Sequence, residues 1–255
     1  MSEFPDWSRQ LSSGIRFDWG LAGVRALGPQ STAVVVVDVL SFTTAVSVAA
    51  DAGTLVLPYR WRDGNAAGFA AEQYAELAVG RKAMSEQQPW SLSPAALRRA
   101  TAPARLVLPS PNGSAISAAV TGIPVIAACL RNASAVADWI AGQGWGTERK
   151  PVAVIAAGEH WPSSDVMRPA IEDWLGAAAI ITALAERATG PLSSEASAAK
   201  ASYDGIDDVR SLIHNCASGR ELAAIGFGDD VAIATEIETS KAVPVLVDGA
   251  FTNAS

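Results

Sequence analysis

Short runs of apolar, often β-branched residues alternate along the chain with alanine-rich amphipathic stretches. This alternation predicts βα units around a largely parallel sheet, and most runs are apolar throughout, as in strands covered on both faces. The predicted strands are residues 33–40, 54–58, 105–109, 123–129, 152–157, 231–235 and 244–247. The predicted helices are residues 42–52, 64–78, 94–100, 114–121, 132–141, 169–188, 195–215 and 219–226. We therefore expect an α/β fold, a three-layer α/β/α arrangement with a mostly parallel central sheet.

Two segments interrupt the apolar pattern. Glycine and charged residues replace it at 142–151, which makes this segment a candidate flexible crossing between two halves. The run after it is as apolar as those before, so we expect a single domain over residues 1–255. Residues 80–94 show no hydrophobic periodicity, which predicts a long loop. Such a loop is either functional or a mobile segment of the surface.

The composition indicates a globular protein: hydrophobic residues make up 49% and charged residues 18% of the 255. The net charge of −7 argues against a nucleic-acid partner, because that binding relies on cationic side chains. No apolar run approaches the about 20 residues of a membrane span, and the first ten residues lack a secretory signal. We expect a cytoplasmic protein without membrane contact, and its apolar helix faces make a homodimer a candidate assembly.

Polar residues follow the first predicted strands, at the sheet edge where ligands of parallel α/β proteins gather. Asp38 ends an apolar run, and Thr43 starts the next helix. A carboxylate in such a run is costly unless it is hydrogen-bonded or bound to a metal. Asn112, Gly113 and Ser114 form a turn whose amide groups could bind an anion, although the same sequence also occurs in ordinary turns.

The next two strand ends offer further candidates. Arg131 could hold an oxyanion or lie on the surface, and Asn132 could cap the following helix. Glu159 and His160 come just past the strand at 152–157. His160 could act as an acid or base, but a structural or surface role is the more common one.

Two adjacent acidic residues open the long predicted helix at 169–188. Glu172 and Asp173 could complement the positive end of the helix dipole, or one of them could face Asp38. Together with Glu159, these carboxylates resemble the oxygen ligands that suit Mg²⁺. A zinc site is less favoured, because two histidines and two cysteines would have to converge from distant segments. Neither a GxxxxGK[ST] loop nor a GxSxG elbow occurs in the sequence.

The ordered set of motifs resembles the 2-phosphosulfolactate phosphatase family from about residue 30 onward. The segments that carry the resemblance are VVVVDVLSFTTAVSVAADAG at 34–53, PNGSA at 111–115, RNASAVADWI at 131–140, AAGE with RPAIEDWLGAAAII within 156–181, ASGRELAAIGFGDDV at 217–231 and VPVLVDGAF at 243–251. The resemblance implies a Mg²⁺-dependent acid phosphatase of α/β/α architecture. Its reaction would convert 2-phospho-3-sulfolactate to 3-sulfolactate and phosphate, a step towards coenzyme M.

The resemblance also implies site residues. The family motifs map onto Asp38 to Leu40, onto Asn112 to Ser114, onto Asn132 and onto the pair Glu172 and Asp173. From the residues and the resemblance together, we expect catalytic roles for Asp38, Glu172 and Asp173, and Mg²⁺ binding by these three and Glu159. The expected substrate-binding residues are Thr43, Asn112, Gly113, Ser114, Arg131 and Asn132. The attacking group could be water or a hydroxyl of Thr43, Thr44 or Ser114.

The sequence departs from the family pattern at two places. Ser41 stands where members usually carry arginine. In place of the family's Gly-Glu-Arg and Gly-Asn-Ser-Pro stretches, this chain has Val79-Gly80-Arg81 and Leu92-Ser93-Pro94. Arg131, Arg81 or Lys82 could replace the lost cation. Alternative functions are therefore a phosphatase for another small phosphorylated hydroxy acid, or a non-catalytic small-anion-binding protein. A loop at 80–94 that brings Arg81 or Lys82 over the site would favour catalysis.

Overall fold

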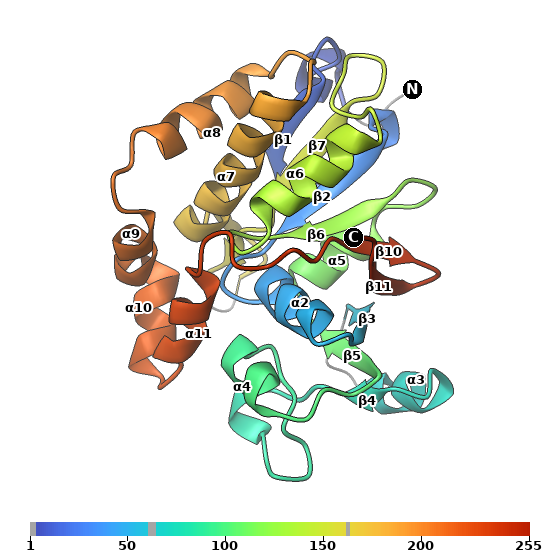
Figure 1. Cartoon of the computed structure of the whole chain (residues 1–255), viewed down its shortest axis with the longest axis vertical. Coiled ribbons are helices and arrows are strands. Elements are labelled where there is room, and N and C mark those ends of the chain that lie inside the picture. The colour runs from blue at the N-terminus through green and yellow to red at the C-terminus, as the bar shows by residue number, and fades with distance from the viewer. Residues whose placement is uncertain (1–3, 61–64, 162–163) are drawn as a thin grey trace.

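The computed structural model describes residues 4–60, 65–161 and 164–255 (Figure 1). Within these residues the main sheet has nine strands in the order β1-β7-β2-β6-β10-β11-β3-β5-β4. Their bounds are β1 Ile15–Trp19, β2 Ala33–Val37, β3 Leu55–Tyr59, β4 Glu76–Leu77, β5 Arg105–Pro109, β6 Val125–Ala128, β7 Val152–Ala156, β10 Pro244–Val247 and β11 Ala250–Asn253. A separate antiparallel pair, β8 Glu159–His160 and β9 Met167–Arg168, follows β7.

Helices cover both faces of the sheet. The bounds are α1 Gly20–Leu27, α2 Phe42–Asp51, α3 Ala66–Glu72, α4 Pro94–Arg99, α5 Gly113–Ala118, α6 Ala133–Gly142, α7 Ile171–Arg187, α8 Ser194–Asp204, α9 Val209–Asn215, α10 Ala217–Ala224 and α11 Gly228–Ala234. Among the described residues, no helix is both long and apolar enough to cross a membrane. The expected three-layer α/β/α fold is confirmed.

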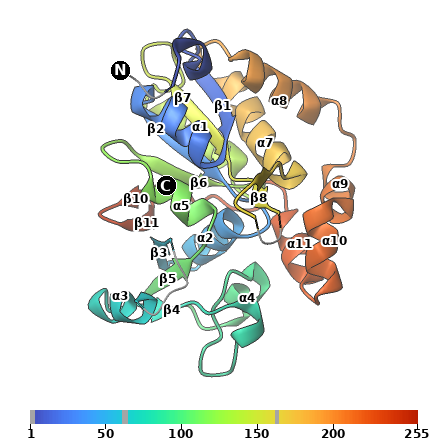
Figure 2. The ribbon, with the colours of Figure 1, turned by 180° about the vertical axis from the view of Figure 1, so that it is seen from behind.

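The central strand shows why the layers form. All five residues of β2 are buried, and alternate side chains of a strand point to opposite faces. Val35 and Val37 pack with α6, α7 and α8, whereas Val34 and Val36 pack with α1, α2 and α5. Figure 1 shows the first group of helices in front of the sheet, and Figure 2 shows α1 and α5 on its other side.

Two parallel blocks of strands are joined by an antiparallel hairpin. The strands β1, β7, β2 and β6 form one block, and β3, β5 and β4 form the other. Between them β10 pairs with β6 at Val245–Ile126, and β11 pairs with β3 at Phe251–Val56. Each junction therefore consists of a single residue pair.

Several sequence-based boundaries differ from the structure. The expected strand at 231–235 is wrong: it lies in α11, because a short apolar run does not by itself distinguish a strand from a buried helix. The strand at 244–247 is present but antiparallel. Within the described part of the expected helix at 64–78, which leaves out residue 64, the helix ends at Glu72 and β4 follows it. The segment at 142–151 contains a turn between Gly146 and Lys150, after which β7 joins the same sheet.

Candidate functional site

Asp38 lies where β2 ends and α2 begins, and its backbone is fixed by Thr43. The hydroxyl of Thr43 accepts from Asp38 N and donates to Asp38 O, both at 2.9 Å. The carboxylate is also held: Oδ1 accepts from Phe42 N at 3.2 Å, and Oδ2 accepts from Gly113 N at 3.0 Å. Only 6% of Asp38 is exposed. The residue therefore joins the starts of α2 and α5, which come from different blocks of the sheet.

The approach of Gly113 to Asp38 requires a residue without a side chain. A Cβ at this position would lie 2.3 Å from Cδ1 of Phe42 and 2.9 Å from Oδ2 of Asp38. Phe42 has little room to yield, because it is fully buried and packs edge-on against Phe251 with ring centroids 6.0 Å apart. The glycine thus permits the backbone N–H to reach the carboxylate.

The two acidic residues of α7 point to different partners. Asp173 accepts from Val39 N at 2.7 Å and from Gly158 N at 2.9 Å, so it ties the loop after β2 to the loop after β7. Glu172 accepts from the thiol of Cys216 at 3.3 Å. Both carboxylates are nearly fully buried. This divergence agrees with the about 100° between adjacent side chains on a helix.

The buried carboxylates perturb one another. Burial, followed by the charges of Glu159 and Glu172, raises the pKa of Asp38 to about 7. Burial and then the charge of Asp38 hold the pKa of Asp173 well above its usual range. Burial is also the main cause of the raised pKa of Glu159. The cluster therefore favours either bound protons or a nearby cation at neutral pH.

A cavity of about 330 Å³ opens beside this cluster. Its lining residues are Asp38, Ser41, Arg60, Arg81, Leu92, Ser110, Pro111, Asn112 and Glu159. Asn112 donates from Nδ2 to Glu159 Oε2 at 3.1 Å, whereas its Oδ1 is buried without a hydrogen-bond partner. The cavity is thus lined by both acidic and basic side chains, and by one amide oxygen, Asn112 Oδ1, that has no hydrogen-bond partner.

Arg81 reaches the cavity from the loop at 80–94. Its Nη2 donates to Ser41 Oγ at 3.1 Å and to Leu92 O at 3.2 Å, and its Nε donates to Asp230 Oδ2 at 3.1 Å. The guanidinium also lies over the ring of Phe227, 5.6 Å from its centroid. The loop therefore brings a cation to the serine that precedes α2, whereas the neighbouring Lys82 is exposed.

Other expected site residues turn away from this cavity. Arg131 donates to Ser47 Oγ at 2.8 Å and to Asp51 Oδ2 at 2.9 Å, near the far end of α2. Asn132 precedes α6 but does not cap it: its Oδ1 accepts from Cys129 N, and its Nδ2 donates to Ala242 O. These side chains are buried, and their polar atoms serve the fold around them.

The remaining expected residues lie at the site with differing access. Gly113 contributes its N–H to Asp38, and Ser114 donates to Leu108 O at 3.2 Å from a buried position. His160 is exposed on β8 and borders two further cavities. Among residues 4–60, 65–161 and 164–255, no three His, Cys, Asp or Glu side chains form a group that could hold a metal ion.

Two arginines that line cavities are not among the residues expected from the sequence. Arg60 lines the cavity beside Asp38, and Arg168 lines one of the two cavities that His160 borders. Arg60 directly follows β3, so the rule that ligands gather at the carboxyl ends of parallel strands could have found it. Arg168 lies on β9, a two-residue strand in a stretch without an apolar pattern. The available sequence signal is its place as the first residue of the motif segment RPAIEDWLGAAAII.

Comparison with known proteins gives a consistent result. The family model described as 2-phosphosulpholactate phosphatase matches residues 25–249. Two curated relatives, each named probable 2-phosphosulfolactate phosphatase, come from Thermotoga maritima and Thermotoga petrophila. Each is 27% identical over 147 residues, which cover 57% of this chain and 58% of the relative. The similarity thus spans somewhat more than half the length of either relative.

Proposed function

The chain belongs to the 2-phosphosulpholactate phosphatase family, and from this premise we propose that it is a phosphoric monoester hydrolase acting on 2-phospho-3-sulfolactate. The products would be 3-sulfolactate and phosphate, and the reaction would be a step towards coenzyme M in the cytoplasm. The names of the two curated relatives support the same activity.

The observation that carries this proposal is the composition of the cavity beside Asp38. Arg60 and Arg81 line it together with the carboxylates of Asp38 and Glu159. Guanidinium groups bind phosphate oxygens well, because their planar donors match phosphate geometry. Since Arg81 donates to Ser41 Oγ, its guanidinium lies beside the position at which the family pattern has arginine. The family's cation would thus be supplied by the loop.

We further propose Mg²⁺ as the cofactor, held by Asp38, Glu159 and the amide oxygen of Asn112. The partnerless Oδ1 of Asn112 is a hard oxygen on the same cavity wall as the two carboxylates. Mg²⁺ commonly takes one or two carboxylates and fills its other positions with water or substrate phosphate, so a group of three acidic ligands is not needed. Bound Mg²⁺ would supply positive charge that offsets the carboxylates and stabilises the transferring phosphoryl group.

The residues of the chain then have distinct tasks in the proposed reaction. Arg60 and Arg81 would bind the phosphate oxygens, and the N–H groups of Phe42 and Gly113 would keep the Asp38 carboxylate in place. Asp173 would act as a positioning residue, because its hydrogen bonds to Val39 N and Gly158 N set the loops beside Asp38. A hydroxyl of Thr43 is a poor nucleophile here, since both its hydrogen-bonding roles are taken by Asp38.

The proposal is tested by measuring phosphate release from 2-phosphosulfolactate with Mg²⁺ or with a chelator. We expect chelator to abolish turnover and Asp38→Asn to lower kcat/KM at least about 100-fold, the scale of a lost transition-state contact. Asp248→Asn is the matched control, because Asp248 is exposed in the turn between β10 and β11. Full activity of Asp38→Asn, or turnover in chelator, would contradict the assignment.

The presence of Ser41 instead of arginine favours a second candidate, a phosphatase for another small phosphorylated hydroxy acid. In this proposal Arg81 supplies the cation, and it reaches Ser41 Oγ from the loop at 80–94 instead of extending from position 41. A panel of phosphorylated hydroxy acids, compared with 2-phosphosulfolactate by kcat/KM, separates the two. Tight anion binding without phosphate release from any member would instead indicate a binding protein.

A further inference from the structure

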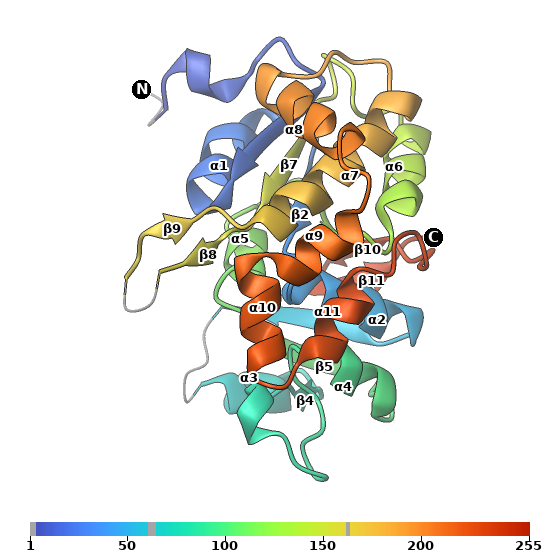
Figure 3. The same cartoon turned by 90° about the vertical axis from the view of Figure 1, so that its left-hand side faces the viewer.

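A second, larger cavity of about 550 Å³ adjoins the first. Ser41, Arg81 and Glu159 line both cavities, so the two lie side by side at these residues. The far side of the second cavity is formed by Arg168 on β9 and by Ser218 in the first turn of α10. Figure 3 shows the β8–β9 hairpin projecting from the sheet, with the helices α9, α10 and α11 beside it.

Arg168 is held in place by a hydrogen bond and a ring contact, and its charge acts on the carboxylate of Glu159, which lines the same cavity. Its Nη2 donates to Ser218 Oγ at 3.2 Å, and its Cζ lies 5.7 Å from the ring centroid of Trp161. In the part of the chain that the structure describes, Arg168 forms no ion pair with a carboxylate. By contrast, Arg81 is paired with Asp230 and Arg131 with Asp51. Arg168 is therefore a half-buried, preoriented cation that faces a cavity.

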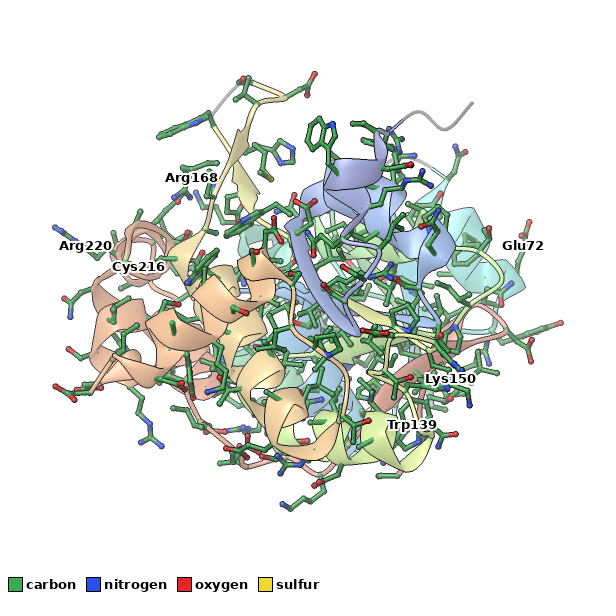
Figure 4. All side chains as sticks on the ribbon, turned by 90° about the horizontal axis from the view of Figure 1, so that it is seen from above. Glu72, Trp139, Lys150, Arg168, Cys216 and Arg220 are labelled. Carbon is green, nitrogen blue, oxygen red and sulfur yellow. The ribbon has the colours of Figure 1, made fainter. Side chains whose placement is uncertain are left out.

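Two neighbouring features favour negative charge beside Arg168, although the carboxylates of Glu159 and Glu221 also line this cavity. Ala217 and Ser218 of the cavity wall belong to the first turn of α10, where the helix dipole is positive. Ser218 Oγ accepts from Arg168, and none of the described residues takes a hydrogen bond from this hydroxyl, so its proton is available to an anion. Figure 4 places Arg168 on the side of the hairpin that faces Cys216 at the start of α10.

We propose that Arg168 and Ser218 form a second anion subsite, which binds the carboxylate or sulfonate of the substrate while its phosphate lies in the cavity beside Asp38. This inference rests on the proposed phosphatase function. It gives the second cavity a chemical role: it would select phosphate esters that carry an additional acidic group over simple phosphate monoesters. Arg168 would then be a specificity-determining residue that takes no part in phosphate transfer.

The test compares three substrates in the wild type and in Arg168→Gln. The substrates are 2-phosphosulfolactate, 2-phospholactate, which lacks the sulfonate, and 4-nitrophenyl phosphate, which has neither acidic group. We expect Arg168→Gln to lower kcat/KM for 2-phosphosulfolactate about 10- to 100-fold, mainly through KM, because a charged hydrogen bond is lost. Hydrolysis of 4-nitrophenyl phosphate should change less than about 3-fold. An equal loss on 2-phospholactate assigns the subsite to the carboxylate, and no loss there assigns it to the sulfonate.

The controls are Arg168→Lys and Arg220→Gln. Lysine keeps the charge but not the planar fork, so it should restore part of the lost kcat/KM. Arg220 is an exposed arginine of α10 outside both cavities, and its replacement should change nothing. The proposal is overturned if Arg168→Gln affects all three substrates equally or affects none.

A binding measurement keeps the subsite testable if the wild type hydrolyses none of the substrates. Titration calorimetry with 3-sulfolactate, which has both acidic groups and no phosphate, probes the subsite alone. We expect Arg168→Gln to weaken this binding about 10-fold or more, with Arg220→Gln unchanged. Absent turnover with intact Arg168-dependent binding would reject the phosphatase function and retain the anion subsite. Binding of 3-sulfolactate that does not depend on Arg168 would reject the subsite.

Discussion

At the scale of single residues, the site depends on the contact between Gly113 and Asp38. The N–H of Gly113 reaches Oδ2 because no Cβ stands between this backbone and the ring of Phe42. A methyl group here must displace either the aromatic ring or the start of α5. Either movement would change where the Asp38 carboxylate points, since the backbone amide that holds Oδ2 would shift.

We therefore predict that Gly113→Ala lowers both stability and activity. Overpacking at this position should cost about 1–3 kcal/mol in the free energy of unfolding, and kcat/KM should fall at least about 10-fold. Urea unfolding and phosphate release are the measurements. Gly68→Ala in α3 is the control, because nothing lies within 4 Å of a Cβ there and its stability should stay the same or rise. Equal stability of the two variants would contradict the steric explanation.

The sequence predicts which strand end several site residues follow, but it does not predict the orientation of their side chains. Asp38 and Asn112 follow strands of the parallel blocks, and both line the cavity as the strand-end rule predicts. Arg131 and Asn132 follow β6 in the same way, yet their side chains bond to Ser47 and Ala242. A strand end specifies a place in the sheet, whereas the orientation of a side chain depends on partners that are distant in sequence.

At the scale of elements, the loop at 80–94 is attached to α11 through one buried carboxylate. Asp230 accepts from Arg81 Nε, from Ser93 Oγ and from Ala95 N. Two consequences follow: Arg81 is kept at Ser41, and the start of α4 is fixed. This attachment could not be predicted, because Asp230 falls in no predicted helix, although it lies in the motif segment at 217–231, and its partners lie more than 100 positions away.

Asp230→Asn is predicted to release the loop. The unfolding free energy should fall by about 2–4 kcal/mol, because a buried ion pair loses one partner while Arg81 keeps some access to the cavity. The KM for the phosphate ester should rise as Arg81 leaves Ser41, and limited proteolysis should cut within 80–94. Asp229→Asn is the matched control, since Asp229 is 86% exposed and lies 3.8 Å from Arg99. Unchanged KM and protease resistance would show that the loop is held by other contacts.

Most strands and helices can be predicted from the pattern of apolar residues. The elements that cannot are those with a short or mixed sequence. The fully apolar strands β2, β5 and β7 were recognisable because both of their faces are buried. β1 has a mixed sequence, IRFDW, and β4 has only two residues, so neither stood out. The apolar run at 231–235 predicts a strand although most of it lies in α11, because five residues are too few for length or hydrophobic periodicity to distinguish a strand from a helix.

At the scale of the whole molecule, the carboxylate cluster makes stability depend on pH. The pKa of Asp38 rises from 3.8 in the unfolded chain to about 7 in the folded protein. Between these values the folded state binds the extra proton, so the free energy of unfolding falls as pH rises. This contribution is fully present below about pH 4 and is lost by about pH 7, and it amounts to at most roughly 4 kcal/mol.

We predict that, in chelator, wild type loses more stability from pH 5 to pH 8 than Asp38→Asn does. Asparagine cannot ionise, so its variant lacks this part of the pH dependence. Millimolar Mg²⁺ should reverse the trend in wild type, because a cation that binds the ionised carboxylate stabilises the folded state by mass action. Thermal melting at both pH values, with and without Mg²⁺, is the measurement. Parallel curves for the two proteins would rule out Asp38 as the titrating group.

The hairpin of β10 and β11 has a consequence for how the protein is made in the cell. Asp38 follows a strand of one parallel block and Gly113 follows a strand of the other, and among the described residues the blocks are joined in the sheet only through residues 244–253. A nascent chain can form each block during translation, but it cannot close the sheet until this segment has left the ribosome. The contact between Asp38 and Gly113 should therefore form after synthesis of the hairpin, and products that end before residue 244 should lack the joined sheet.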